Sequence, residues 1–247
     1  MDVILVPGLW LDASSWDGVA TRLTAAGHAA HALTLRGLDS RSADRQGSML
    51  ADHVAEITAS IDRCRGRVVL VGHAESCGLV HAAVNRRPDR VARAIHVGGL
   101  PSADGAHVLS GFTVDARGTT TMTAGYRAVD ATLAALHKRI ESNASHVLDQ
   151  VQKLTDPRRL AVPVTLVATE FTADDVRRWM AAGIDPAREL PHLADLTIVD
   201  LPAGRWPQIE CPDELSRVLL DAIPAQTGAD ASAAGRTPAI EPVVADS

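Results

Sequence analysis

Six short apolar runs rich in β-branched residues alternate along this chain with longer amphipathic stretches. Most of these runs lead into Gly- or Pro-bearing turns, which is typical of buried strands. Between two of them, Leu50, Val54, Ile57 and Ile61 recur at steps of four, three and four, which predicts one face of a helix. The alternation predicts an α/β fold with a mostly parallel sheet covered by helices on both faces. The predicted strands are Val3–Val6, Ala30–Leu35, Val68–Gly72, Ala94–Gly98, Val164–Thr169 and Thr197–Leu201.

Two segments depart from this rhythm. Residues 101–159 have a polar Thr/Gly-rich start, a helical pattern from Ala124 to Leu154 and no strand pattern, so we expect a helical cap over the strand ends. Residues 224–247 are too poor in apolar side chains to offset their ordering entropy, which predicts a disordered tail. Residues 1–223 therefore form one predicted domain, with the cap inserted in it.

Composition narrows the classes of partner and compartment. A net charge of −6 without a visible basic patch argues against nucleic acid and anionic membranes. No leader or membrane-spanning apolar run is apparent. Cys64, Cys77 and Cys211 are odd in number and lack CxxC spacing, so we expect neither a disulfide framework nor a zinc site, and we place the chain in the cytoplasm.

The segment VVLVGHAESCGLVHAAVNRRPDRV, residues 68–91, reads as a strand, a tight turn and a helix. It resembles the α/β-hydrolase family, in which a strand ends in Gly-His-Ser-x-Gly and a helix runs to Pro-Asp-Arg. Gly72, His73 and Pro88 stand where that family has them. Ala74 occupies the serine position and Ser76 the position of the following glycine.

Two further blocks resemble the same family, in particular its small hydroxynitrile-lyase/esterase-like branch. LVPGLWLDASSWDGVATRLTAAGH is similar to the first strand, oxyanion loop and first helix, which implies that Gly8, Leu9 and Trp10 lie at the oxyanion site. LPAGRWPQIECPDEL is similar to the late Gly-His-Trp-Pro turn that carries the general base, with Arg205 in place of the histidine. The resemblance covers roughly residues 1–222.

The third triad member is left unassigned. In the family the acid usually follows the strand that here reads VPVTLVATEFTADD, and by spacing it falls near Thr172, with Glu170, Asp174 and Asp175 as neighbours. Some members place the acid one strand earlier, where Asp104 would be the candidate.

The two substitutions have plain chemical consequences. A methyl group cannot attack a carbonyl, and arginine, with a pKa above ~12, cannot accept a proton near neutrality. Losing either serine or base in a related triad costs about 10⁶-fold in turnover. Ordinary triad hydrolysis is therefore predicted to be absent.

Other residues near the turn have competing interpretations. Ser76 could act as the nucleophile of Ala74-x-Ser76-x-Gly78, but the spacing to Pro88 favours Ala74 as the turn residue and Ser76 as a helix cap. We expect Cys77 to be a buried, inert thiol and His73 to be a structural turn residue. The remaining histidines show no ligand spacing, so we predict no metal site and no cofactor.

Glu75 and Arg205 are expected to meet at the mouth of the site. The favoured interpretation is a salt bridge that closes an unused pocket. In the alternative, Arg205, a helix N-terminus and the Leu9 and Trp10 amides form a cradle for a carboxylate-bearing small molecule.

Three functions follow from these patterns. The leading prediction is a non-hydrolytic member of the fold, acting as a small-molecule binder, regulator or partner-binding pseudoenzyme. The second is an esterase- or lyase-type enzyme acting on a small ester or carbonyl compound through a carboxylate, and the third is hydrolysis through Ser76. The ligand and the oligomeric state are left open. The candidate carboxylates of the second function are Glu75, Glu170, Asp104 and Asp174.

Overall fold

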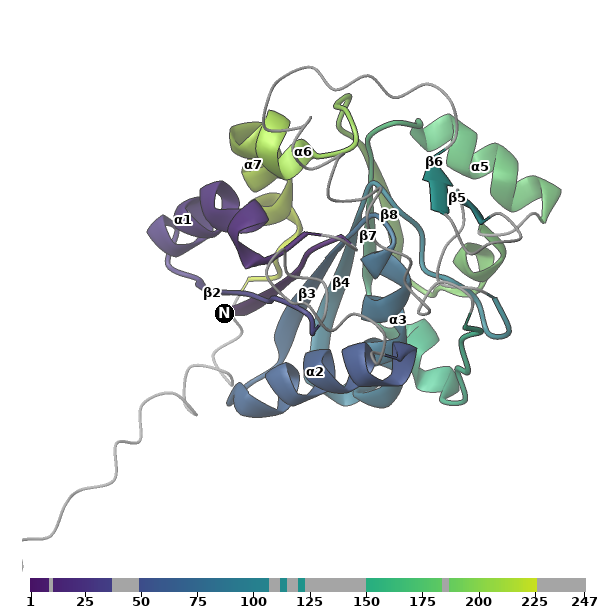
Figure 1. Ribbon diagram of the computed structural model, residues 1–247, viewed down its shortest axis with the longest axis horizontal. Helices are drawn as coiled ribbons and strands as arrows, with labels where there is room; N and C mark the ends of the chain where they lie inside the picture. The colour runs from purple at the N-terminus through teal and green to yellow at the C-terminus, as the bar shows by residue number, and fades with distance from the viewer. Residues whose placement is uncertain are drawn as a thin grey trace, which may run out of the picture.

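The computed structural model describes residues 1–8, 11–36, 49–106, 112–114, 120–122, 150–183 and 187–225. A six-stranded parallel sheet forms its centre, in the order β2-β1-β3-β4-β7-β8, with helices on both sides (Figure 1). The strands are β1 (Asp2–Val6), β2 (Ala29–Ala32), β3 (Val68–His73), β4 (Val91–Val97), β7 (Val164–Ala168) and β8 (Leu196–Asp200). The α-helices are α1 (Asp17–Ala25), α2 (Leu50–Arg63), α3 (Ser76–Arg86), α5 (Ala173–Ala182), α6 (Pro207–Glu210) and α7 (Pro212–Ala222).

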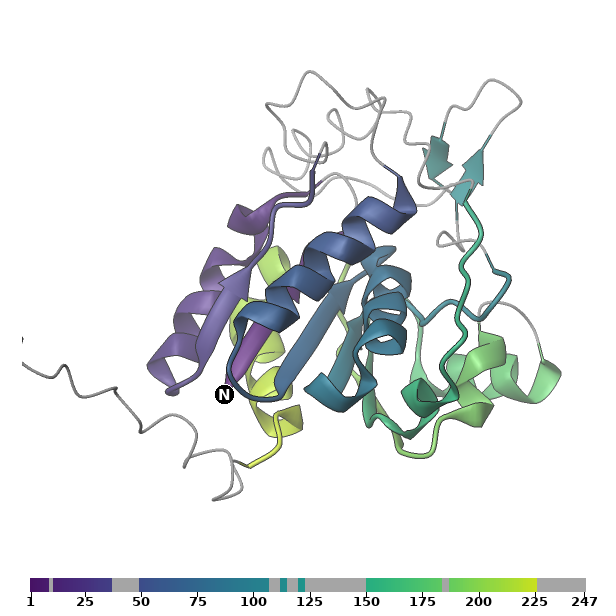
Figure 2. The same cartoon turned by 90° about the horizontal axis from the view of Figure 1, so that it is seen from below.

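The sheet buries both of its faces because successive side chains of a strand point to opposite sides. Ile4 and Val6 of β1 pack in a cluster with residues of α2 and α3, whereas Val3 and Leu5 pack in a second cluster with residues of α1 and α7. The view from below shows the same layers, with α1 and α7 on one side of the sheet and α2 and α3 on the other (Figure 2). The predicted parallel α/β sheet is thus confirmed.

All six predicted strands are present, with boundaries that differ by a few residues. The largest difference is at β2, which ends at Ala32 rather than Leu35, and β4 begins at Val91 rather than Ala94. The helix expected from Leu50 to Ile61 is α2, and its apolar positions Val54, Ile57 and Ile61 are all buried. Within the described part of the chain, no helix is both long and apolar enough to cross a bilayer.

The prediction for residues 101–159 was wrong in two places. A two-stranded antiparallel pair, β5 (Phe112–Val114) and β6 (Thr120–Met122), lies in the stretch where no strand was expected. Its threonines are polar but β-branched, and β-branched residues fit a strand well. The helical pattern from Ala124 to Leu154 does not hold at residues 150–154, because the Gln152 backbone pairs with Gly105 and Ala106. The rest of that pattern, residues 124–149, lies outside the described residues, as does the predicted tail beyond residue 225.

The connecting segments include short 3-10 turns that hold the ends of the longer elements. The four described ones are η1 (Ala13–Trp16), η2 (Pro88–Arg90), η4 (Pro157–Ala161) and η5 (Ala187–His192). The first of them buries Trp16 against the α1/α7 face of the sheet. The last buries Glu189 on the α2/α3 side, where it meets His81 of α3.

Candidate functional site

A strained turn joins β3 to α3. Ala74 has a φ of +50°, and it is the only non-glycine residue with a positive φ in the described ranges. The left-handed region costs a residue with a Cβ about 1–2 kcal/mol, so neighbouring contacts must impose it. One such contact is the Ala74 N–H, which donates to the Val97 carbonyl of β4 at 2.8 Å. Ala74, and not Ser76, therefore occupies the sharp strand-to-helix turn.

Two glycines make this turn sterically feasible. A Cβ at Gly72 would lie 2.9 Å from Val80 Cγ2, so α3 could not pack as closely on the end of β3. A Cβ at Gly99 would lie 2.2 Å from the Ala74 carbonyl oxygen. Gly72 belongs to the sequence motif, but Gly99 follows a different strand and was not singled out from the sequence.

Ser76 is fully buried in the first turn of α3. Its hydroxyl donates to the Pro7 carbonyl at 2.5 Å, so it ties the β3–α3 turn to the loop after β1. The expected capping role was wrong, because Glu75 is the N-cap residue of α3 and makes no side-chain capping bond. The Ser76 hydroxyl donates instead to the Pro7 carbonyl, in a loop that is far away in sequence.

The Cys77 thiol is also fully buried, as expected. Its Sγ lies 3.4 Å from the Gly72 carbonyl, and burial raises the pKa of the thiol well above its ordinary value. A thiol of this kind stays protonated and is a poor nucleophile.

His73 links the turn to the loop that carries Arg205. Its Nε2 lies 2.7 Å from the Arg205 carbonyl oxygen, and its Nδ1 lies 3.3 Å from Gln208 Nε2. A carbonyl oxygen only accepts, so Nε2 carries the proton and Nδ1 accepts from Gln208. Burial lowers the pKa of His73 to about 4, so the ring is neutral at pH 7. His73 is thus a structural residue of the turn, as the sequence predicted.

Arg205 forms an ion pair with Glu75, as the favoured interpretation predicted. Their side chains are 18% and 6% exposed, respectively, and Arg205 also lies 3.5 Å from Glu170. Burial raises the pKa of Glu75 above its usual value, although the Arg205 charge and a hydrogen bond from the Glu75 backbone N–H lower it.

The other candidate carboxylates are exposed. Glu170 contacts Arg205 from the solvent side, and Asp174 forms an i, i+3 ion pair with Arg177 at 2.6 Å. Asp104 Oδ1 accepts a hydrogen bond from the Leu154 N–H at 2.7 Å, so it fastens a connecting segment. Glu75 is therefore the only one of the four that is buried.

The expected oxyanion loop is described only in part. Gly8 is buried, and a Cβ there would lie 2.7 Å from His73 Nδ1, so only glycine fits against the histidine. Leu9 and Trp10 lie outside the described residues.

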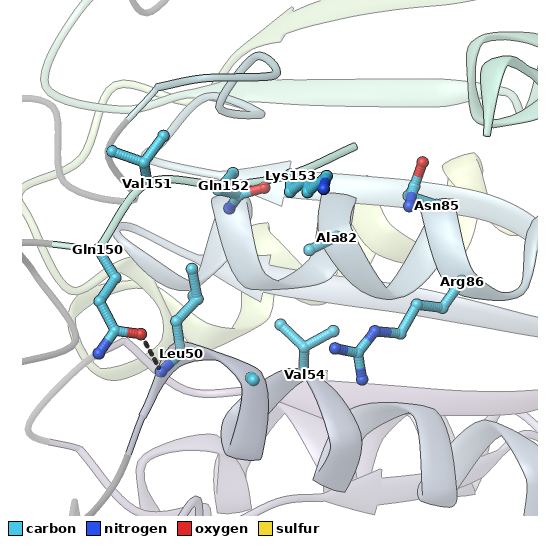
Figure 3. Close-up of a pocket in the computed structure, with 10 residues that line it drawn as sticks. Leu50, Val54, Ala82, Asn85, Arg86, Gln150, Val151, Gln152 and Lys153 are labelled. Atoms are coloured by element: carbon cyan, nitrogen blue, oxygen red, sulfur yellow. Dashed lines mark hydrogen bonds between the residues drawn. The ribbon is translucent and has the colours of Figure 1, made fainter. Parts of the chain in front are cut away.

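A cavity of about 200 Å³ lies elsewhere, between α2, α3 and residues 150–153 (Figure 3). Its wall includes the Leu50 N–H, which donates to Gln150 Oε1 at 3.0 Å. None of the residues around Ala74 lines it, so it is separate from the turn. Its other lining residues are Ala51, Val54, Ala82, Asn85, Arg86, Val151, Gln152 and Lys153.

No sequence pattern indicates several contacts that hold the site together. Gln208 lies 135 residues from His73, and Pro7 lies 69 residues from Ser76. Behind α3, Glu189 accepts from Arg159 at 2.9 Å and contacts His81 at 3.1 Å. Contacts of this kind depend on the fold, because no local pattern places such residues together.

Comparisons with known proteins agree with this architecture. The Alpha/beta hydrolase family model matches residues 3–218. The search of curated protein sequences found no significant match. Among solved structures, a pyrethroid hydrolase from Sphingobium faniae JZ-2 matches with a TM-score of 0.67 and 18% identity, over 90% of this chain and 96% of that chain.

Two plant proteins have the same arrangement. The methylesterase MES16 from Arabidopsis matches with a TM-score of 0.67 and 18% identity, over 90% of this chain and 98% of that chain. Methylketone synthase I from tomato matches with a TM-score of 0.62 and 15% identity, over 90% of this chain and 96% of that chain. At these identities the likeness shows a shared fold. Because the family model spans most of the sequence, the chain belongs to the α/β-hydrolase family.

Proposed function

We propose that this chain is a non-hydrolytic α/β-hydrolase, a small-molecule binder or pseudoenzyme whose triad has been replaced. The observation that carries the proposal is the strained turn itself: the side chain presented there is the methyl group of Ala74. In the serine version of the fold, that turn exposes the nucleophile at the top of the sheet. Here the turn is retained and the reactive atom is missing.

No neighbouring side chain supplies a replacement in the geometry described. The Ser76 hydroxyl donates to Pro7 and is fully buried, and the Cys77 thiol is buried and protonated. His73 has both ring nitrogens engaged, so it is not placed to serve as a base for either. A nucleophile needs a base within hydrogen-bond reach, and these residues have none among their described contacts.

The Glu75–Arg205 pair further supports a site without hydrolysis. The N–H that follows the turn residue would bind the oxyanion of an acyl intermediate in a serine enzyme. In this chain that N–H belongs to Glu75, whose buried carboxylate pairs with Arg205. An anionic ligand would have to displace Glu75 from Arg205, so the pair favours an uncharged ligand over the carboxylate cradle.

The test is a gain of function in matched variants. Wild type should release no p-nitrophenol from p-nitrophenyl butyrate above background and should not be labelled by a fluorophosphonate probe. The triple variant Ala74→Ser/Glu75→Gln/Arg205→His restores a nucleophile and a base, so it should be labelled. Glu75 is changed as well because removing Arg205 alone would leave its buried carboxylate uncompensated.

The matched control is Ala74→Ser alone, which supplies the hydroxyl without the base and should be labelled far more slowly. Wild-type turnover that disappears in Ser76→Ala would overturn the proposal and establish hydrolysis through Ser76. An inactive triple variant that is folded by circular dichroism would contradict the claim that these three side chains alone block the chemistry.

A second function, acid–base chemistry on a small carbonyl compound, rests on Glu75. The Glu75 side chain is buried and has a raised pKa, which is the combination expected of a general acid or base. The tomato neighbour was crystallised in complex with β-ketoheptanoate, a carbonyl compound. Proton exchange at the α-carbon of pentan-2-one in D2O, followed by NMR, tests this function: wild type should accelerate the exchange, Glu75→Gln should not, and exposed Glu170→Gln should behave as wild type.

A further inference from the structure

Three side chains of different chemistry meet at one edge of the sheet, away from the turn at Ala74. They are the carboxylate of Asp2 in β1, the imidazole of His31 in β2 and the thiol of Cys64, the residue that ends α2. Their ligand atoms all lie within 4.8 Å of one another, and Asp2 Oδ1 lies 2.8 Å from His31 Nε2. We propose that Asp2, His31 and Cys64 form a binding site for a divalent transition metal, with zinc as the best-fitting ion.

The fold explains why these residues meet. In the parallel register of β1 and β2, Asp2 lies opposite Ala29 and Ile4 opposite His31. Residues two apart on a strand share a face, so Asp2 and His31 point to the same side of the sheet. The α2 helix packs on that face through Ile57 and Ile61, and Cys64 follows at its C-terminus.

The donor set is the one that zinc prefers. Thiolate sulfur, imidazole nitrogen and carboxylate oxygen bind zinc at about 2.0–2.3 Å, in a tetrahedron whose donors lie roughly 3.3–3.6 Å apart. To share one ion, the donors at the 4.8 Å limit would have to approach by about 1.2–1.5 Å, and Asp2 Oδ1 and His31 Nε2, now 2.8 Å apart, would have to separate by roughly 0.5–0.8 Å. Three protein donors leave the fourth position to water, and the partial exposure of Asp2 and His31 gives the ion a path from solvent.

The charges at the site balance. Thiolate and carboxylate together carry two negative charges, which a divalent ion neutralises, while the imidazole binds in its neutral form. Burial and the Asp2 charge raise the pKa of the Cys64 thiol, so the thiol is protonated at neutral pH without metal and releases one proton when the ion binds. Arg90 and Arg63 lie nearby, and their positive charges lower this pKa. The Arg90 guanidinium donates to the Cys64 carbonyl at 2.6 Å and is thereby held on the backbone of this residue.

The sequence contains no signal for this site. Asp2 and His31 are 29 residues apart, and Cys64 lies on a third element. Metal motifs are recognised by short, repeated ligand spacings, and the three residues have none. The sequence-based prediction of no metal site therefore reflected the lack of a motif, which a site assembled from three distant segments does not need.

Cobalt serves as the probe because it replaces zinc with the same donors and absorbs light. Full-length, tag-free protein is reduced, stripped with chelator and titrated with Co²⁺ at pH 7.5. We expect thiolate-to-cobalt charge-transfer absorption in the near ultraviolet, saturating at one equivalent and abolished by excess Zn²⁺. Cys64→Ser should lose this absorption, whereas Cys211→Ser, which removes another half-buried free thiol, should retain it.

A second pair of variants separates ligation from folding. His31→Ala should lower the affinity for Co²⁺ at least tenfold, while His28→Ala, one residue before β2, should leave it unchanged. Zinc should raise the melting temperature of wild type and of Cys211→Ser but not of Cys64→Ser, because an ion that binds only the folded state stabilises it. The affinity should increase with pH as the thiol loses its proton more readily.

Clear outcomes overturn the proposal. These are the absence of charge-transfer absorption in wild type, its persistence in Cys64→Ser, or its equal loss in the Cys211→Ser control. Circular dichroism of each variant before titration distinguishes loss of a ligand from loss of the fold. All of these readouts are independent of the chemistry at the Ala74 turn.

Discussion

Two buried carboxylates of this chain have pKa values that are shifted in opposite directions. Glu189 is 5% exposed, contacts both Arg159 and His81, and has a pKa below its usual value even though burial alone would raise it. Glu75 is 8% exposed and has Arg205 as its close cationic partner, yet its pKa is raised, because desolvation outweighs that charge. The protein therefore stabilises the charged form of Glu189 and destabilises the charged form of Glu75.

The difference separates a structural contact from a candidate functional one. Glu189 fastens η5 and η4 to α3 through two donors, an arrangement that satisfies a buried charge. Glu75 sits immediately after a strained turn, where its carboxylate is incompletely compensated. Ionisable groups with perturbed pKa values cluster at functional sites. In the family, the strand-to-helix turn that Ala74 occupies here carries the catalytic nucleophile.

The largest expected effect comes from removing the structural carboxylate. Glu189→Ala leaves the Arg159 guanidinium buried without its carboxylate partner, which should lower the free energy of unfolding by about 3–5 kcal/mol. Urea denaturation at pH 7 measures it. Exposed Glu214→Ala, which breaks a surface pair with Arg217, is the control and should change stability far less. A loss of stability no larger than that of Glu214→Ala would mean that Glu189 does not have the structural role assigned to it.

Removing Arg205, the partner of Glu75, should lower the free energy of unfolding by a smaller amount. Arg205→Met leaves Glu75 unpaired, but its pKa is already raised, so it takes up a proton instead of remaining charged. We expect a loss of about 1–2 kcal/mol, mostly recovered in Glu75→Gln/Arg205→Met, because replacing both partners is close to neutral. A double-mutant cycle in urea gives the coupling. A loss of stability as large as that of Glu189→Ala would mean that the ion pairs of Glu75 and Glu189 contribute equally to stability.

The pH dependence of stability should have opposite signs at the two positions. A raised folded pKa means that Glu75 contributes stability below the ordinary value of 4.5 that is lost as the pH rises through the folded pKa. A lowered folded pKa means that Glu189 contributes stability above 4.5 that is lost as the pH falls through the folded pKa. Wild type should therefore lose stability relative to Glu75→Gln as the pH rises above about 4.5, and relative to Glu189→Gln as the pH falls below about 4.5.

Each comparison is made as a difference between wild type and variant at the same pH. His73 has a pKa of about 4, against 6.5 when unfolded, so the stability of every variant falls as the pH drops from about 6.5 to about 4. Subtracting the wild-type and variant stabilities at each pH removes this shared contribution. Differences of the same sign at both positions would contradict the assignment.

The smallest effect tests the strain beside Glu75. Ala74→Gly relieves a φ of +50°, but glycine gains entropy in the unfolded chain, so we expect a net stabilisation of about 0.5 kcal/mol. Ala83→Gly, in the buried interior of α3, has ordinary helical backbone and should instead destabilise by about 1 kcal/mol or more. Chemical denaturation of both variants measures the contrast, and destabilisation at both positions would show that the turn is unstrained.

Much of the fold followed from local patterns. The alternation of β-branched runs and amphipathic stretches predicted the six parallel strands, and the Gly72-His73 and Pro88-Asp89-Arg90 spacing placed Ala74 at the turn. The β5–β6 pair was missed because its threonines make the stretch look polar. The extended Gln152 segment was missed because its partners, Gly105 and Ala106, lie far away in sequence.

At the site, the residue types were predictable but their contacts were not. The pairing of Arg205 with Glu75 could be proposed because each adjoins a family motif. The role of Ser76 was wrong, since the Pro7 carbonyl that takes its hydroxyl belongs to another loop. Asp104 and Asp174 were candidates by spacing, but Asp104 accepts from the distant Leu154 N–H and Asp174 forms an ion pair with Arg177 one helical turn away.

By itself, the sequence determined the order of strands and helices along the chain, and it predicted that the turn lacks triad chemistry, because a methyl group and a guanidinium have the same reactivity in any fold. The tertiary structure decided which side chains are charged and what they contact. Glu75 and Glu189 are chemically identical, and only the number and placement of their partners separate their pKa values. Asp2, His31 and Cys64 likewise meet only because strand register and helix packing bring three distant segments together.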